Sequence, residues 1–397
     1  MSRTATFAAP TSYTWRRWLA VVALGISAFT IVTSELAPIG LLSALAQDFN
    51  QPQASTGIVV TAYAWVAAVA ALLSGALPQR ISRRLLLTGL MLLLALSCLA
   101  VAWAGSFNLL LAARITGALA HGAFWALIGT VAAQLVPPAR LGLATAIIFG
   151  GVSAASVAGV PLTNFLAHVA GWRSAFTLIA AIALLTACVI AWSVPQLKAA
   201  APLGLRALWL LLTQRAFLQL YFATACVITA HFAAFTWIEP LLSETLRLPA
   251  SLVSILLLVF GLAGVGGNVV AGKFIDRHLK GLAIAALVLA AAAVALLAIL
   301  PVQGHPAAIG LLLLGWGTGI AVIFVGFQTW LLRLAGEAAQ AASAIYVAIF
   351  NAAIGLGALA GSLLLRFTSV EGVLLTASAA IMFSLAPVLL LPAPARN

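Results

Sequence analysis

Residues 19–45 read LAVVALGISAFTIVTSELAPIGLLSAL and contain a single charged side chain, Glu35. A helix needs about 20 apolar residues to cross the hydrocarbon core of a bilayer, so this run is long enough to span one. A carboxylate inside hydrocarbon costs on the order of 3 kcal/mol even on the lenient insertion scale. Because the whole chain has only 7 acidic residues, an acid at this position indicates a functional role.

The composition is that of a membrane protein. Hydrophobic residues make up 64% of the chain, charged residues 7%, and the mean hydropathy is +1.19. A soluble domain is about half apolar and about a quarter charged. The net charge of +12 does not indicate nucleic acid, because the basic residues lie in short loops and not on one face. Cys98, Cys188 and Cys226 lie within apolar runs and are typical of small core residues, not of a disulfide or metal set.

Twelve apolar runs predict an all-α membrane protein, because a helix is the open segment that satisfies its own backbone in lipid. We expect the spans at residues 17–45, 56–78, 84–104, 108–135, 141–168, 173–194, 214–242, 250–273, 281–301, 306–333, 339–365 and 371–392. The longest connection divides six spans from six. It predicts an N-terminal six-helix bundle (1–194), a cytoplasmic linker (195–213) and a C-terminal six-helix bundle (214–397).

Lysine and arginine predict the orientation of the spans. Fifteen of the 19 lie at the N-terminus, in every second loop or at the C-terminus, and the intervening loops hold three. The positive-inside rule therefore places both termini in the cytoplasm. The fifteen are Arg3, Arg16, Arg17, Arg80, Arg83, Arg84, Arg140, Lys198, Arg206, Arg215, Lys273, Arg277, Lys280, Arg333 and Arg396.

The two halves also repeat in sequence. Leu41-Leu42-Ser43 after Glu35 matches Leu241-Leu242-Ser243 after Glu239. The segment that starts at Gly75 after span 2 matches the one at Gly272 after span 8, again about 200 residues later. Two parallel six-helix repeats with a binding site at their interface are typical of a secondary transporter.

These features resemble the major facilitator superfamily, and within it the bacterial drug:proton antiporters. Gly75-x-x-x-Gln79-Arg80-x-Ser82-Arg83-Arg84 is similar to the loop signature Gly-x-x-x-Asp-Arg-x-Gly-Arg-Arg, from which Gln79 and Ser82 depart. Its second-half copy keeps an acid, Asp276. Three further features agree with the family: Arg114 in span 4, Gly150, Gly159 and Pro161 in span 5, and Gly171-Trp172-Arg173 before span 6.

A closer resemblance is to the sugar-efflux transporters of the SotB type. It is carried by residues 35–43 (ELAPIGLLS), 63–66 (YAWV), 120–125 (AHGAFW), 229–231 (TAH), 238–240 (IEP) and 350–355 (FNAAIG). It implies a monomer in the bacterial cytoplasmic (inner) membrane that exports small sugars or sugar-like solutes, driven by the proton gradient and not by a cofactor. Close relatives are associated with drugs such as chloramphenicol, with arabinose or with nucleosides, so a multidrug exporter is the first alternative.

Glu35 is the leading candidate for the proton-carrying group. It lies 18 residues after Arg17, about 27 Å along the helix and so toward the outer side of the membrane. Arg114 lies about 9 Å in from the outer end of span 4, at a similar depth. The arginine favours the carboxylate and burial favours the neutral acid, a competition that suits proton exchange. The alternative is a static ion pair that fixes helix packing. Glu239, about 36 Å from Arg215, is a second proton or substrate group, or simply a hydrated interfacial acid.

Two histidines lie within spans, and each is a candidate for sugar binding or proton relay. His121 follows Arg114 by seven residues, so both lie on one side of span 4, and His231 precedes Glu239 by eight. The alternative for each is a hydrogen bond to a neighbouring helix. No carboxylate or cysteine lies at ligand spacing in the same helix, so we expect no metal site.

The remaining candidate substrate groups are amides and aromatic rings. Asn351 and Gln328 can donate to and accept from a polyol, although Gln328 lies near the cytoplasmic end. Aromatic rings could stack on a sugar or a drug, or pack against lipid. They are Tyr63, Trp65, Trp125, Phe232, Phe235, Trp237 and Phe350.

The charged loop residues form a separate set. By resemblance, Arg80, Arg83, Arg84, Asp276 and Arg277 would latch the helices on the cytoplasmic side; the alternative is that they only set topology.

Other functions are disfavoured by what the sequence does not contain. It has no phosphate-binding loop for ATP and no nucleophile-base set or paired catalytic carboxylates, so we do not expect an enzyme. A non-transporting receptor or scaffold would need a soluble domain or long tail, whereas the predicted termini are short.

Overall fold

The structure, a computed structural model, describes residues 14–73, 81–137, 140–197, 205–300, 302 and 305–391. All regular elements in these ranges are helices, and 12 of the helical segments are long and apolar enough to cross a membrane. The predicted fold class, an all-α membrane protein with twelve spans, is therefore confirmed.

The first half contains six spans, several of which are built from more than one helix. Its elements are α1 (Thr14–Leu36), η2 (Ala37–Gly40), α2 (Leu42–Asp48), α3 (Gln53–Thr56), α4 (Ile58–Leu73), α5 (Arg83–Ala102), α6 (Phe107–Leu135), α7 (Leu141–Ala154), η5 (Ala155–Gly159), α8 (Val160–Ala170) and α9 (Trp172–Ser193).

The second half repeats this plan. Its elements are α11 (Arg215–Phe235), α12 (Ile238–Pro240), η6 (Leu241–Thr245), α13 (Ala250–Ile299), α14 (Pro306–Ala335), η7 (Gly336–Ala338), α15 (Ala339–Leu365), α16 (Val370–Phe383) and α17 (Leu385–Leu390). The predicted linker contains a short helix of its own, α10 (Leu205–Leu212), which packs against α11 and α15.

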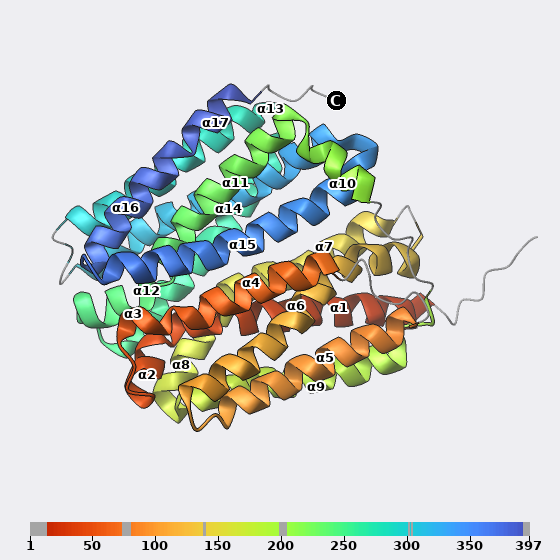
Figure 1. Cartoon of the computed structure of the whole chain (residues 1–397), viewed down its shortest axis with the longest axis horizontal. Coiled ribbons are helices and arrows are strands. Elements are labelled where there is room, and N and C mark those ends of the chain that lie inside the picture. The colour runs from red at the N-terminus through yellow and green to blue at the C-terminus, as the bar shows by residue number, and fades with distance from the viewer. Residues whose placement is uncertain are drawn as a thin grey trace, which may run out of the picture.

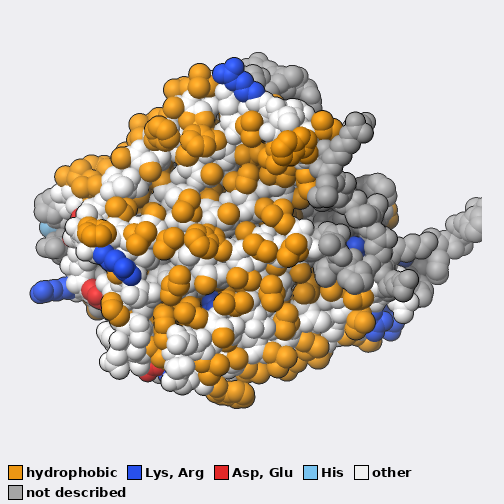
Figure 2. All heavy atoms as spheres, viewed as in Figure 1, with side chains coloured by type: hydrophobic (Ala, Val, Ile, Leu, Met, Phe, Trp, Pro, Cys, Tyr) orange, Lys and Arg blue, Asp and Glu red, His pale blue; other side chains and the backbone are white. Residues whose placement is uncertain are grey.

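The two halves lie beside each other, and α4 of the first runs along α15 of the second (Figure 1). The beginning of α1 lies toward one end of the bundle, and α2, α3 and α12 lie at the other (Figure 1). Figure 2 shows that the face over α4 and α15 is covered mainly by hydrophobic side chains, with charged groups toward its ends. This is the surface expected of a protein surrounded by lipid.

Buried apolar side chains form two large clusters. One is made of residues from the first half, and the other is made almost entirely of second-half residues. Five first-half residues join the second cluster, and they lie in η2, α2, α4 and α8: Ile39, Leu42, Val60, Ala64 and Val160. These segments are therefore where the halves pack together.

Prolines explain where the long helices break. Pro38 lies in a 3₁₀ turn that ends α1, so the predicted first span is a helix, a turn and a second helix. Pro161 lacks the N–H that would bond the carbonyl of Val157, and a π-helical turn spans Ala155–Gly159. Another π-turn, Leu241–Thr245, directly follows Pro240. The break inside α13 occurs at a histidine: the backbone of His278 is non-helical and separates two spans.

Glycines permit the closest helix approaches, and one gives a direct test of the packing. A Cβ added at Gly122 on α6 would collide with the carbonyl oxygen of Ala67 on α4 and lie 2.8 Å from the Cβ of Ala70. Overpacking of this kind costs about 1–3 kcal/mol. We therefore expect Gly122→Ala to lower the free energy of unfolding, measured by denaturant titration in micelles. Gly89→Ala is the matched control, because nothing lies within 4 Å of a Cβ there; equal destabilisation of both would contradict this packing.

Candidate functional site

The candidate proton site lies where α1 ends. Glu35 is the last residue but one of α1, and only 7% of its surface is exposed. The carbonyl of Ser34 would normally accept from the N–H four residues later, but that residue is Pro38, which has no N–H. The proline thus leaves a buried carbonyl without its helical donor beside the acid.

Arg114 supplies the missing donor. Its Nη1 donates to the carbonyl oxygen of Ser34 at 2.6 Å, and its Nη2 donates to the carbonyl oxygen of Glu35 at 3.3 Å. The guanidinium also lies over the ring of Tyr63, with 3.9 Å between Cζ of Arg114 and the ring centroid. Only 1% of the surface of Arg114 is exposed. The negative end of the α1 dipole and the aromatic face both favour this buried cation. Its hydrogen bonds therefore go to the backbone of Glu35 and not to the carboxylate.

His121 lies close to the carboxylate of Glu35. Its Nε2 lies 3.9 Å from Oε2 of Glu35, and the residue is 2% exposed. Its ring meets Tyr63 edge-on, with 5.5 Å between centroids. Arg114 and His121 therefore both contact Tyr63, as their seven-residue spacing on one helix allows.

Several polar atoms of this site have no hydrogen-bond partner among the residues that the structure describes. They include Oε1 of Glu35, Nδ1 of His121 and Nε of Arg114. Most buried polar atoms in proteins are hydrogen-bonded, so a group of exceptions within one small volume calls for an explanation. A site that exchanges protons or binds hydroxyl groups provides one, because its polar atoms must stay available to a mobile partner.

His231 lies in a separate cluster in the second half. Its Nδ1 accepts a hydrogen bond from Nε1 of Trp316 at 3.1 Å, so this nitrogen carries no proton. Phe235 stacks on its ring with 5.1 Å between centroids. Phe232, Phe260 and Phe324 complete an aromatic enclosure around it. Among the described residues, no hydrogen bond or ring contact joins this cluster to the one around Glu35.

Glu239 connects the two halves. Its Oε2 accepts hydrogen bonds from the Oγ of Ser43 at 2.8 Å and from the backbone N–H of Ser43 at 3.2 Å. Because Ser43 lies in the first turn of α2, the carboxylate also caps that helix. Glu239 is only 4% exposed, so in this state it is a buried, hydrogen-bonded acid and not a hydrated one.

A second connection between the halves passes through Asn164 on α8. Its Nδ2 donates to the carbonyl oxygen of Gly40 at 2.8 Å, and its Oδ1 accepts from the Oγ of Ser254 on α13 at 2.6 Å. Both connections lie at the end of the bundle opposite the beginning of α1 (Figure 1). The halves are therefore fastened to each other at this end.

The structure places the other predicted site residues as follows. Asn351 is buried in α15 and its Nδ2 donates to the carbonyl of Val347 in its own helix, while its Oδ1 has no partner. Gln328 is half-buried in α14. Trp125 lies between His121 and Phe149, 6.4 and 5.8 Å from their ring centroids.

The predicted latch is only partly described. Arg83 is buried at the start of α5, Arg84 is half-buried and Arg277 is exposed. Arg80 lies outside the described residues, as does the side chain of Asp276. The latch therefore stays a prediction.

Four residues that make these contacts were not predicted from the sequence: Ser43, Asn164, Ser254 and Trp316. Asn164 had a detectable signal, since an asparagine inside a predicted span is costly, as it is for Asn351. Serines form hydrogen bonds within their own helices, so Ser43 and Ser254 carried no such signal.

Comparison with known proteins agrees with this arrangement. Residues 20–348 match the Major Facilitator Superfamily. A bacterial homolog of the human lysosomal transporter Spinster, in an inward-facing and unoccupied conformation, is 15% identical with a TM-score of 0.71, over 96% of this chain and 95% of that one. A mutant of the nucleoside transporter NupG is 13% identical with a TM-score of 0.78, over 94% and 99%. At such identities the likeness concerns the fold alone.

The fold is that of a membrane transporter. The match to the family model extends over most of the chain, and the protein belongs to the Major Facilitator Superfamily.

Proposed function

We propose that this transporter exports small sugars or sugar-like solutes in exchange for protons, as a monomer in the bacterial inner membrane with both termini in the cytoplasm. The observation that carries the proposal is the set of buried polar atoms around Glu35 that have no hydrogen-bond partner in the described part of the chain. Under this orientation the fastened end faces outward.

The arrangement of Arg114 supports a carboxyl group that can change its protonation. The guanidinium is held by two backbone carbonyls and by Tyr63, so its position does not depend on the charge of the Glu35 carboxyl. When Glu35 is ionised, the nearby cation compensates its charge. When Glu35 is protonated, Arg114 keeps its carbonyl partners. Both protonation states thus leave the arginine stabilised.

In this scheme His121 contributes hydrogen bonds to the solute. It lies beside the carboxylate, its Nδ1 has no hydrogen-bond partner within the described ranges, and its ring contacts Tyr63. An imidazole and a carboxyl can together donate to and accept from sugar hydroxyls. A proton on Glu35 and a hydroxyl bound to it would compete, which couples the two fluxes.

A multidrug exporter is the second candidate, and a specific observation favours it. The enclosure of Phe232, Phe235, Phe260, Trp316 and Phe324 around His231 offers apolar rings rather than hydroxyl partners. Such walls are typical of sites for apolar ligands.

One experiment separates the two. Purified protein in proteoliposomes is given a pH step with labelled arabinose or labelled chloramphenicol, and accumulation is followed. We expect pH-driven accumulation of the sugar. Accumulation of chloramphenicol alone would favour the second candidate, and movement of each compound independent of the pH step would contradict proton coupling.

Glu239 gives a further prediction. The side-chain carbonyl of glutamine can still accept from the Oγ and the N–H of Ser43, whereas alanine cannot. We expect Glu239→Gln to retain most transport and Glu239→Ala to lose it through weaker closure of this end. Loss of coupling in Glu239→Gln would instead assign this acid a proton. Glu244→Gln is the control, because Glu244 is an exposed acid in the same segment.

A further inference from the structure

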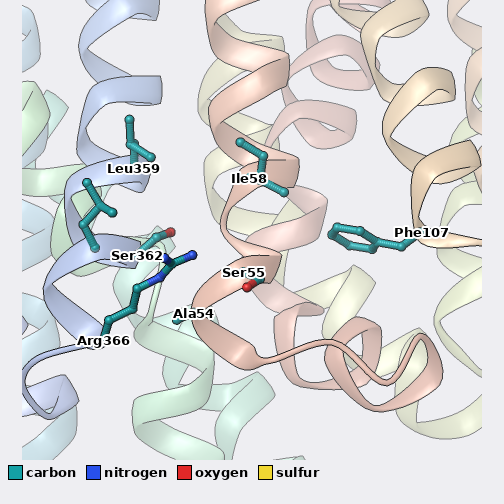
Figure 3. A pocket seen from close by; sticks show the side chains of 8 residues that line it. Ala54, Ser55, Ile58, Phe107, Leu359, Ser362 and Arg366 are labelled. Atoms are coloured by element: carbon teal, nitrogen blue, oxygen red, sulfur yellow. The ribbon is translucent and has the colours of Figure 1, made fainter.

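A lateral groove runs between the halves near the fastened end of the bundle. Its volume is about 270 Å³. Figure 3 shows the first-half residues on α3 and α4 facing the second-half residues on α15, with Phe107 beside them. The groove is lined by Ala54, Ser55, Ile58, Phe107, Leu359, Ser362, Leu363 and Arg366.

The groove opens onto the apolar perimeter of the protein. Leu359 and Leu363 lie on one face of α15 at helical spacing, and Arg366 is the C-cap residue directly after this helix. Leu363 is 46% exposed, and the neighbouring Leu356 and Phe367 are exposed as well. In a protein that spans a membrane, such a perimeter is in contact with acyl chains.

Arg366 stands at the polar end of this groove. The membrane span of α15 ends at Leu365, so Arg366 lies at the boundary between the hydrocarbon and the headgroups. Figure 3 shows its guanidinium directed toward Ser362 and Ser55, into the groove. The ion pairs among the described residues involve Asp48 and Glu35, so no described carboxylate neutralises Arg366.

We propose that this groove binds an anionic phospholipid, with one acyl chain between α4 and α15 and its phosphate on Arg366. The groove is at the lower limit of the volumes that hold drug-sized ligands, which suits a segment of a chain. A cation at the headgroup level favours a lipid with net negative charge, by about fivefold for one arginine.

The position of the groove gives the lipid a role in the conformational equilibrium. Its walls come from both halves, so separation of α4 from α15 would dismantle it. A ligand that binds one state better than the other stabilises that state. The bound lipid therefore stabilises the state in which this end is closed, whichever solute is transported.

Native mass spectrometry of the protein in mixed micelles of phosphatidylglycerol and phosphatidylethanolamine tests the proposal. We expect the parental protein to retain the anionic lipid about fivefold more than the zwitterionic one. Arg366→Gln should remove the preference. Arg247→Gln is the matched control, since Arg247 is an exposed arginine that does not line the groove.

A second variant tests the chain-binding part. Ala54→Trp should fill the groove and reduce retention of both lipids, with the fold checked by size-exclusion chromatography. Unchanged selectivity in Arg366→Gln, or equal loss in Arg247→Gln, would overturn the headgroup assignment. Undiminished retention in Ala54→Trp would overturn the groove itself.

Discussion

Replacement of Glu35 by Gln is expected to abolish pH-driven accumulation of solute while solute-for-solute exchange continues. Gln has nearly the shape of the protonated acid but cannot release a proton. One proton moving with the membrane potential supplies about 2.3 kcal/mol per 100 mV, which corresponds to about a fiftyfold concentration ratio for a neutral solute. The variant should reach a ratio near one, measured with labelled arabinose in proteoliposomes under an imposed pH step and potential.

Glu244→Gln is the matched control for this experiment. Glu244 is an exposed acid in η6, and its loss should leave accumulation unchanged. Accumulation by Glu35→Gln at the parental ratio would remove Glu35 from the proton path.

The second large effect concerns Arg114. Arg114→Leu removes the donors to the carbonyl oxygens of Ser34 and Glu35 and leaves both buried acceptors without them. Hydrogen bonds from charged donors contribute about 1.5–3 kcal/mol in soluble proteins, and those within membranes somewhat less. We expect a loss of about 2 kcal/mol in the free energy of unfolding in micelles, together with loss of transport. Arg114→Lys should recover only part of the stability, because an ammonium cannot reproduce the planar fork.

Pro38→Ala in the Arg114→Leu background tests the reason for this loss. The new backbone N–H at position 38 can bond the carbonyl of Ser34, so stability should partly return while transport does not. Stability that stays low would show that the carbonyl of Ser34 is not what Arg114 stabilises.

The fold was largely predictable from hydropathy, because each span has to satisfy its own backbone. The predicted span 173–194 is the helix Trp172–Ser193, and the predicted 339–365 is Ala339–Leu365. The breaks were harder to locate. Pro38 predicted a loosened backbone, but it did not predict a 3₁₀ turn followed by a new helix. The conformation after the proline depends on the helices that pack against this segment.

The candidate site was predictable by residue type and not by partner. Sequence spacing placed Arg114 and His121 on one side of a helix, and both contact Tyr63. It could not show that Arg114 bonds backbone carbonyls, or that His121 is the side chain near the carboxylate. Those facts depend on the rotation of α1 against α6, which the packing of neighbouring helices decides.

We propose that protonation of Glu35 is linked to which end of the transporter is open, and proton coupling depends on this link. This link can be tested without knowing the solute. If the coupling free energy between protonation and conformation is about 1–3 kcal/mol, the titration midpoint of Glu35 must differ by about 1–2 pH units between the two states. Cysteines at positions 43 and 239, joined by a short bifunctional thiol reagent, would hold the fastened end closed. Cys188 and Cys226 would be replaced by serine in this background.

The carboxyl C=O stretch of Glu35 is then followed by infrared spectroscopy across pH, and identified by its absence in Glu35→Gln. The account predicts that the titration midpoint differs between the cross-linked and the unlinked protein by about 1–2 pH units. The same midpoint in both would contradict it, because the proton on Glu35 would then be indifferent to the conformation.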